Sequence, residues 1–202
     1  MPRKAIKVII PIAIVVILIL IIYGSFKGTY NKMVVMDEGV KASWSQVENV
    51  YQRRFDLIPN LVETVKGYAA HESDTFTEVA EARANAGGVM KMSDELLNDP
   101  AAFERFQQAQ STLGGALQRL LVVTENYPEL KANQNFMALQ DQLEGTENRI
   151  AVERKRFNEQ VQSYNTYIKQ FPRMIIANMT GFDEKPYFEA SQGADTAPKV
   201  EF

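Results

Sequence analysis

The chain has 202 residues, with 22 Lys and Arg, 25 Asp and Glu, and no cysteine. Without cysteine it can form neither disulfides nor thiolate-ligated metal sites, and it suits a reducing or an oxidising compartment equally well. Residues 28–202 hold 18 Lys and Arg against all 25 Asp and Glu, a net charge of −7. This acidity argues against a general attraction to nucleic acid or to anionic lipid.

The N-terminal segment 5–23 is an apolar stretch in which Lys7 is the only charged residue. As a helix rising about 1.5 Å per residue it would cover about 28 Å, enough to cross the hydrocarbon core of a bilayer. The basic residues before it are typical of a signal peptide, but residues 24–27 offer no small-residue cleavage motif. We therefore predict an uncleaved signal anchor, with the lipid bilayer as the partner of residues 5–23.

Charges on the two flanks of this segment predict its orientation. Arg3, Lys4 and Lys7 precede the apolar core, whereas Lys27 and Lys32 follow it. The positive-inside rule therefore places the N-terminus in the cytoplasm and the rest of the chain outside, as a single-pass protein.

The anchor itself is predicted to be a tether. Residues 8–23 contain no ionisable or amide side chain, whereas channels and transporters carry such groups along their path. Gly24 and Gly28 follow the span and are interpreted as a flexible joint to the first soluble helix, because glycine weakens helix continuation. The alternative, a G-x-x-x-G dimerisation face, is less favoured because Lys27 lies between the two glycines. Residues 1–28 thus form the cytoplasmic N-terminus and anchor.

Apolar residues in the rest of the chain recur at steps of three, four and seven, which predicts long amphipathic helices. No segment shows sustained alternation of apolar and polar residues with β-branched enrichment, so no sheet is expected. The predicted fold is all-α: a transmembrane helix followed by an antiparallel bundle of long helices. The three stripes comprise Val40, Trp44, Val47, Tyr51, Ile58, Leu61, Val65 and Tyr68; then Phe103, Phe106, Leu113, Leu117, Leu120 and Leu121; then Phe136, Leu139, Leu143, Ile150, Phe157, Val161, Tyr164, Ile168 and Phe171.

Helix boundaries are indicated by glycine, proline and capping residues. Gly87-Gly88 is expected to stop the first helical region, and residues 88–99 are expected to form a loop. Asp99 and Pro100 then suit the N-cap and the first position of the next helix.

Two further prolines mark later boundaries. Tyr127-Pro128 is expected to close the second stripe, because proline excludes its predecessor from helical geometry. Asn133 or Asn135 can cap the last long helix, which Pro172 ends.

Pro59 leaves two alternatives open. It lacks a backbone donor and its ring clashes with the carbonyl of Phe55, so the helix must either kink or turn there. The flanking residues are apolar and include no glycine, which favours a kink within one continuous helix over an exposed hairpin.

The chain resembles the LemA family of bacterial membrane proteins in blocks that run in family order along nearly its whole length. They include VKASWSQVEN at 40–49, QRRFDLIPNLV at 52–62, VKGYAAHE at 65–72, EAR at 81–83, YPELKA at 127–132, LQDQLE at 139–144 and ENRIA at 147–151. The resemblance implies the bacterial inner membrane, one N-terminal span and a four-helix bundle over residues 29–182. The four-helix bundle shifts Pro59 toward a turn or a sharp bend. The resemblance implies no enzymatic activity. It implies a role in membrane organisation, because some members of the family are associated with bacterial membrane compartments.

No pattern in the sequence supports catalysis, a cofactor or a metal site. His71-Glu72 begins like H-E-x-x-H, but Thr75 takes the place of the second histidine and the chain has no other histidine. P-loop, dinucleotide-binding and nucleophile-elbow motifs do not occur. We therefore predict no enzyme, no cofactor and no catalytic or metal-binding residue.

The first candidate structural or interface residues are Pro59, the nearby Arg53, Arg54, Asp56 and Asn60, and Trp44. The favoured interpretation is that the two arginines and Asp56 satisfy backbone groups left unpaired by Pro59 and fix the angle of the bend. The alternative is that Arg54, on the apolar stripe, pairs across a subunit boundary, where a bidentate arginine can specify register.

Residues 172–182 are predicted to form a short helix opened by proline and closed by glycine. It has more apolar side chains than one narrow stripe can bury. The favoured interpretation is a plug at the end of the bundle, with Phe171 and Phe182 capping helix termini; docking on a partner or on the membrane is the alternative. The candidate contact residues are Met174, Ile175, Ile176, Met179 and Phe182. The remaining residues, 183–202, are expected to be a disordered tail.

The leading functional prediction is a membrane-tethered scaffold that self-associates through helix faces as a homo-oligomer and helps to organise the bacterial envelope or membrane. The alternative is an extracytoplasmic sensory or regulatory module. Because few residues precede the span, such a module would have to act through another membrane protein.

Overall fold

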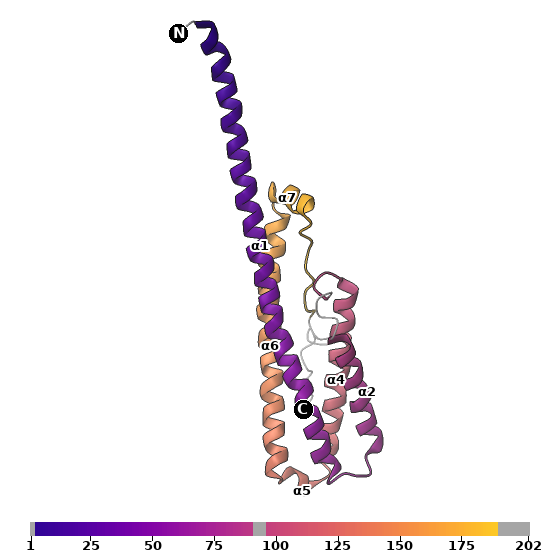
Figure 1. The fold of residues 1–202 in the computed structure, drawn as a ribbon. Coiled ribbons are helices and arrows are strands. Elements are labelled where there is room, and N and C mark those ends of the chain that lie inside the picture. Colours follow the sequence, from indigo (N-terminus) through magenta and orange to yellow (C-terminus); the bar gives the residue numbers. More distant parts are fainter. Residues whose placement is uncertain (1–2, 91–95, 190–202) are drawn as a thin grey trace, which may run out of the picture.

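The computed structural model describes residues 3–90 and 96–189, and every regular element in this part of the chain is a helix (Figure 1). The predicted all-α fold is therefore confirmed. The elements are α1 (Arg3–Lys66), α2 (Ser73–Met90), α4 (Pro100–Thr124), α5 (Pro128–Lys131), α6 (Gln134–Lys169) and α7 (Arg173–Thr180).

The four long helices form an antiparallel bundle, as predicted (Figure 1). Helix α1 packs along α6, and α2 packs along α4, with each helix running opposite to its partner. The short α5 links α4 to α6 at one end of the bundle, and α7 lies beside α1 and α6 at the other end.

Helix α1 is one continuous helix of 64 residues that includes both the apolar segment and the first wall of the bundle. It passes through Pro59, so the helix stays continuous there and the hairpin does not form. Gly24 and Gly28 lie inside it, so the expected flexible joint is wrong: two isolated glycines do not interrupt this helix. Residues 11–23 extend beyond the bundle with their apolar side chains exposed, and α1 is the one described helix long and apolar enough to cross a membrane.

Two predicted caps are confirmed. The Asp99 carboxylate accepts a 2.9 Å hydrogen bond from the backbone N–H of Ala101 at the start of α4. The Asn133 side-chain oxygen accepts hydrogen bonds of 2.9 and 3.0 Å from the N–H groups of Asn135 and Phe136 at the start of α6.

The other helix ends differ from the prediction. The first helix ends at Lys66, and Gly67 begins the turn into α2. Helix α2 then runs through Gly87-Gly88 to Met90, so this pair is not a break. Gly87 permits a close approach, because a Cβ atom there would lie 3.0 Å from the ring of Phe55. Helix α4 ends at Thr124, before Tyr127-Pro128. Residues 88–90 of the predicted loop 88–99 therefore belong to α2. Residues 91–95 of that loop lie outside the described residues.

The interior of the bundle divides into two hydrophobic clusters. The aromatic core, nearer the exposed part of α1, contains Met33, Val40, Trp44, Val47, Tyr51, Leu96, Leu97, Ala102, Phe103, Phe106, Ile150, Phe157, Val161, Tyr164, Ile168, Ala177 and Phe188. The aliphatic core, nearer α5, contains Ile58, Leu61, Val65, Ala69, Phe76, Val79, Ala82, Ala86, Leu113, Ala116, Leu117, Leu120, Leu130, Phe136 and Leu143.

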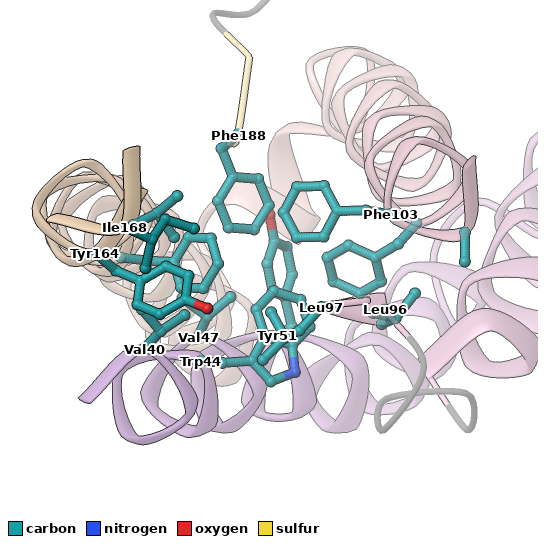
Figure 2. Close-up of a cluster of buried hydrophobic side chains, with 14 of the residues drawn as sticks. Val40, Trp44, Val47, Tyr51, Leu96, Leu97, Phe103, Tyr164, Ile168 and Phe188 are labelled. Atoms are coloured by element: carbon teal, nitrogen blue, oxygen red, sulfur yellow. The ribbon is translucent and has the colours of Figure 1, made fainter. Parts of the chain in front are cut away.

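Residues 183–189 follow α7 as an extended segment that packs into the bundle, and we call it the C-terminal strap. The expectation of a disordered tail does not hold for these residues. Phe188 is buried among the rings of the aromatic core, and Figure 2 shows its side chain entering that core from the strap. Residues 190–202, the rest of the expected tail, lie outside the described residues.

Candidate functional site

Arg54 occupies the boundary between the two cores. Its side chain is 4% exposed, and its Nη1 donates a 3.0 Å hydrogen bond to Glu147 on α6. Its Nη2 donates to the side-chain oxygen of Gln110 on α4, and the guanidinium lies 5.0 Å from the ring centroid of Tyr51. We call Arg54, Gln110 and Glu147 the arginine layer. On each of the three helices this layer falls between the residues of the aromatic core and those of the aliphatic core.

This arrangement differs from both sequence interpretations of Arg54. The guanidinium does not contact the backbone near Pro59, and it pairs within its own chain. Both Nη groups are occupied and the side chain is buried, which leaves no exposed guanidinium for a second copy to bind. Arg54 instead joins α1, α4 and α6 at one level of the bundle.

The backbone group released by Pro59 is satisfied by a residue that the sequence prediction did not select. The Nε of Arg83, on α2, donates a 3.3 Å hydrogen bond to the carbonyl of Phe55, and its guanidinium lies 3.8 Å from the Phe55 ring centroid. This is the carbonyl that the Pro59 ring excludes from helical hydrogen bonding. Arg83 therefore attaches α2 to α1 at the proline.

The remaining candidates near Pro59 lie on the surface. Arg53, Asp56 and Asn60 are exposed, and Asp56 accepts a 2.7 Å hydrogen bond from Gln52 one turn earlier. The Asn60 backbone carbonyl accepts from the Thr64 hydroxyl at 2.8 Å. The structure does not bring these three residues together with Arg54.

Trp44 is a core residue. Its indole packs against four aromatic rings, with centroid separations between 5.3 and 6.0 Å. These rings come from α4, α6 and the C-terminal strap, so Trp44 connects three parts of the chain (Figure 2). They belong to Phe103, Phe106, Phe157 and Phe188.

Two asparagines on α6 hold the C-terminal strap by its backbone. The Asn165 amide donates to the carbonyl of Lys185 and accepts from its N–H, both at 2.9 Å. The Asn158 amide makes the same pair of hydrogen bonds with Phe188, also at 2.9 Å. The two asparagines are seven residues apart, which places them on one helix face. The sequence analysis selected neither asparagine.

A buried ion pair adds to this attachment. Lys185 is 8% exposed, its Nζ lies 3.3 Å from a carboxylate oxygen of Asp37 on α1, and it donates a 2.6 Å hydrogen bond to Asn98. The Tyr164 hydroxyl donates to the backbone carbonyl of Asp183 at 3.0 Å. Burial raises the pKa of Tyr164, and the nearby Asp37 and Asp183 carboxylates add to this effect.

Two clefts lie next to these networks. The more polar, about 580 Å³, opens between α4 and α6 over the arginine layer, and Arg154 and Glu189 also line it. The buried Nε2 of Gln110 has no hydrogen-bond partner there. The other cleft, about 700 Å³, lies beside Trp44 and is lined also by Met90 and Leu96, which border the undescribed residues 91–95.

Helix α7 forms as predicted and ends at Thr180, followed by the C-cap Gly181, whose φ of 75° places it in the left-handed region that glycine adopts readily. Its side chains divide into two groups. Ala177 is buried, and Ile176 and Phe182 pack against the aromatic core. Met174, Ile175 and Met179 are exposed, and Phe171, just before the helix, is 80% exposed. The favoured plug interpretation is therefore wrong for Phe171 and describes only the inner side of α7.

The described residues contain no group of three or more histidine, aspartate or glutamate side chains that could hold a metal ion. His71, the chain's single histidine, is exposed in the turn between α1 and α2. Burial also raises the pKa of Tyr51. The networks at Arg54 and Arg83 join helices to one another, and the network at Asn165 joins the C-terminal strap to α6.

These features define a class: an all-helical antiparallel bundle that continues directly into a candidate membrane-spanning helix, with polar residues that connect its elements. The chain belongs to the LemA family, whose match covers residues 43–202.

Relatives from three bacteria support this assignment. Magnetosome protein MamQ of Magnetospirillum gryphiswaldense is 32% identical over 182 residues, which cover 83% of this chain and 67% of the relative. Magnetosome protein MamQ 2 of Paramagnetospirillum magneticum is 31% identical with the same coverage. Protein LemA of Metamycoplasma hominis is 21% identical over 172 residues, 85% of this chain and 74% of the relative. None of these names denotes an enzyme.

Proposed function

We propose that this protein is a membrane-anchored scaffold that self-associates as a homo-oligomer and helps to organise the bacterial membrane or envelope. The observation that carries the proposal is the continuity of α1, which joins the exposed apolar segment to the bundle without a break. A helix of this kind holds the bundle at a defined height and direction relative to the bilayer that residues 5–23 cross.

The bundle itself is suited to such a role. Arg54, Arg83 and Lys185 each tie α1 to another element, so the bundle resists relative sliding of its helices. The magnetosome relatives give additional support, because their names place them in a specialised bacterial structure.

The test of self-association is the mass of the full-length protein in mild detergent and in lipid nanodiscs, measured together with electron microscopy. We expect particles at a discrete multiple of the protomer mass. A monomer at micromolar concentration in both environments would contradict the proposal and favour a regulatory role.

The test of rigid anchoring is a pair of insertions between Gly28 and Thr29, ahead of Met33, where α1 enters the aromatic core. A helix-forming insert of about seven residues adds two turns and preserves the helix face, whereas a Gly-Ser insert of equal length breaks the connection. We expect particle images in which the bundle keeps a fixed position over the micelle with the helical insert and loses it with the flexible one. Equally sharp images for both would show that the rigid connection is unimportant.

We further propose that the N-terminus is cytoplasmic and the bundle extracytoplasmic, in the inner membrane. The support is the excess of basic residues before the span. Because the chain has no cysteine, Val122→Cys on the exposed surface of α4 provides a single label site. We expect a membrane-impermeant maleimide to label it in intact spheroplasts. Labelling only after lysis would show that the bundle lies in the cytoplasm instead.

The alternative function, a sensory or regulatory module that acts through a membrane partner protein, has one observation in its favour. The polar cleft over the arginine layer contains a buried amide nitrogen of Gln110 without a partner, as a ligand site would. The continuous α1 could carry a change at this level toward the membrane. A monomeric protein in the mass measurement would favour this alternative.

A further inference from the structure

Helix α7 lies at the end of the bundle from which the apolar part of α1 emerges (Figure 1). It contacts α1 and α6, and Phe182 packs edge-on against Tyr30 of α1 with a ring-centroid separation of 5.7 Å. Tyr30 follows the end of the predicted span, Tyr23, by seven residues, about 10 Å along a helix. The headgroup region adds about 5–8 Å on each side of the hydrocarbon core, so Tyr30 lies at its outer edge. Helix α7, which packs there, is therefore placed next to the lipid headgroups.

The outer face of α7 is largely apolar. Ile175 and Met179 are four residues apart and lie on one helix face, with Met174 next to Ile175. Phe171 precedes the helix and is also exposed, and Asn178 is the exposed polar residue of this side. The exposed fractions are 80% for Phe171, 51% for Ile175, 72% for Met179 and 44% for Met174. Four large apolar side chains that the bundle leaves uncovered require another apolar environment.

The charge of this end of the bundle differs from that of the rest. Segments 24–36 and 166–182 contain Lys27, Lys32, Lys169 and Arg173 and no Asp or Glu. Residues 37–165, by contrast, contain 13 Lys and Arg against 20 Asp and Glu. Lys169 forms a 2.6 Å ion pair with Glu184, which follows this end, and Arg173 lies over the ring of Tyr167. Lys27 and Lys32 are exposed. The charged residues of these two segments are all basic, so this end is the part of the bundle that suits anionic lipid headgroups.

We propose that α7 is an interfacial helix that lies on the surface of the same bilayer that α1 crosses, with its apolar face among the upper acyl chains and the nearby cations at anionic headgroups. The occupant of the exposed face is the bilayer because α7 is packed on α1 next to the span, and because apolar and basic residues coincide there. The proposal rests on the membrane anchoring proposed above. It gives the bundle a second contact with the membrane, which would fix its tilt and rotation.

The absence of cysteine permits a direct test on the full-length protein. Three single-site variants, Met179→Cys, Val122→Cys and Ile17→Cys, are each labelled with an environment-sensitive fluorophore and placed in nanodiscs that contain one chain each. The nanodiscs consist of phosphatidylcholine with or without phosphatidylglycerol. Quenching by aqueous iodide and by lipids that carry a shallow nitroxide then reports the surroundings of each label. Val122 is the matched control, because it is an exposed apolar residue (64%) on α4.

We expect the label at residue 179 to show severalfold weaker iodide quenching than the label at 122, strong quenching by the shallow nitroxide, and a larger effect with phosphatidylglycerol. Iodide access at 179 equal to that at 122, with the label at 17 still quenched by lipid, would overturn the role of α7 while leaving the anchor intact. Protection at 179 that occurs only in discs with two chains would also overturn it, because a second copy would then cover this face. A label at 17 that lipid does not quench would instead contradict the proposed anchoring.

Discussion

The aromatic core and the aliphatic core both fill the interior of the bundle, but they differ in their side chains and in the elements that enclose them. The aliphatic core is enclosed by α1, α2, α4 and α6 together with α5, and among its buried residues Phe76 and Phe136 are aromatic. In the aromatic core the buried aromatic residues are Trp44, Tyr51, Phe103, Phe106, Phe157, Tyr164 and Phe188. There α2 is described as far as Met90, which packs against this core, and Phe188 of the C-terminal strap enters between α4 and α6 (Figure 2). The comparison shows that large rings and an extended segment can replace part of a helical wall.

The first prediction removes the strap's contribution to the aromatic core. Phe188→Ala deletes a buried ring that contacts four other aromatic rings, and we expect a loss of about 3 kcal/mol in the free energy of unfolding. Denaturant titration of the full chain in detergent, followed by circular dichroism, measures this. The control is Tyr187→Ala, whose side chain is 42% exposed, with an expected change of about 0.5 kcal/mol or less. Equal effects would show that the strap does not belong to the core.

The second prediction concerns the layer that separates the cores. Arg54→Met leaves Gln110 buried without its partner, while Glu147, whose side chain is 43% exposed, stays solvated. We expect a loss of about 2 kcal/mol in the same measurement. Adding Gln110→Leu should recover part of this loss, because replacing both polar partners costs less than removing one. A double variant less stable than the single one would show that the layer does more than join the cores.

A third, smaller effect is expected at the attachment of the strap. Asn165→Ala removes two hydrogen bonds to the buried Lys185 backbone, and we expect a loss of about 1–2 kcal/mol. Asn178→Ala, at an exposed position of α7, is the control and should change stability little. Hydrogen exchange should also increase at Lys185, whose N–H donates to Asn165, before it increases in the aliphatic core. Simultaneous exchange of both regions would mean that the two cores unfold as one.

The fourth and smallest effect is a pH dependence that belongs to the aromatic core. The pKa of Tyr51 and of Tyr164 is raised in the folded chain, mainly by burial, above the ordinary tyrosine value of about 10. Stability is therefore unaffected below about pH 10 and falls as the pH rises above it, because the unfolded chain loses its tyrosine protons first. Tyr164→Phe should make the fall in the thermal midpoint above pH 10 less steep. An unchanged slope would exclude Tyr164 as its source.

The sequence signals that succeeded were those whose cause lies within a few residues. Asp99 and Asn133 cap their helices through hydrogen bonds to N–H groups two or three positions away, so their neighbours suffice to predict them. The apolar stripes also predicted the buried faces of the long helices, because each stripe follows the helical period.

The signals that failed depended on contacts between distant segments. Gly87 was expected to end a helix, whereas it lies within α2 at the point where Phe55 approaches. Arg83 supports the carbonyl near Pro59 from another helix, and its position on α2 gave no local indication of this. Asn158 and Asn165 attach an extended segment that begins 25 and 18 residues later, respectively. The position of Asn165 next to Tyr164 of the predicted apolar stripe is the one signal that could have indicated such a partner, because buried amides need hydrogen bonds.

The length of α1 has one more consequence for a membrane surface that carries many copies of the chain. With residues 5–23 in a bilayer, the part of α1 from Tyr23 to Lys66 projects about 65 Å if it stands upright. The turn at Gly67–Glu72 would then form the outermost contact surface. A dense layer of such chains would act as a spacer that keeps an opposing surface at a distance set by one helix, and shortening that helix by whole turns would reduce the gap in steps.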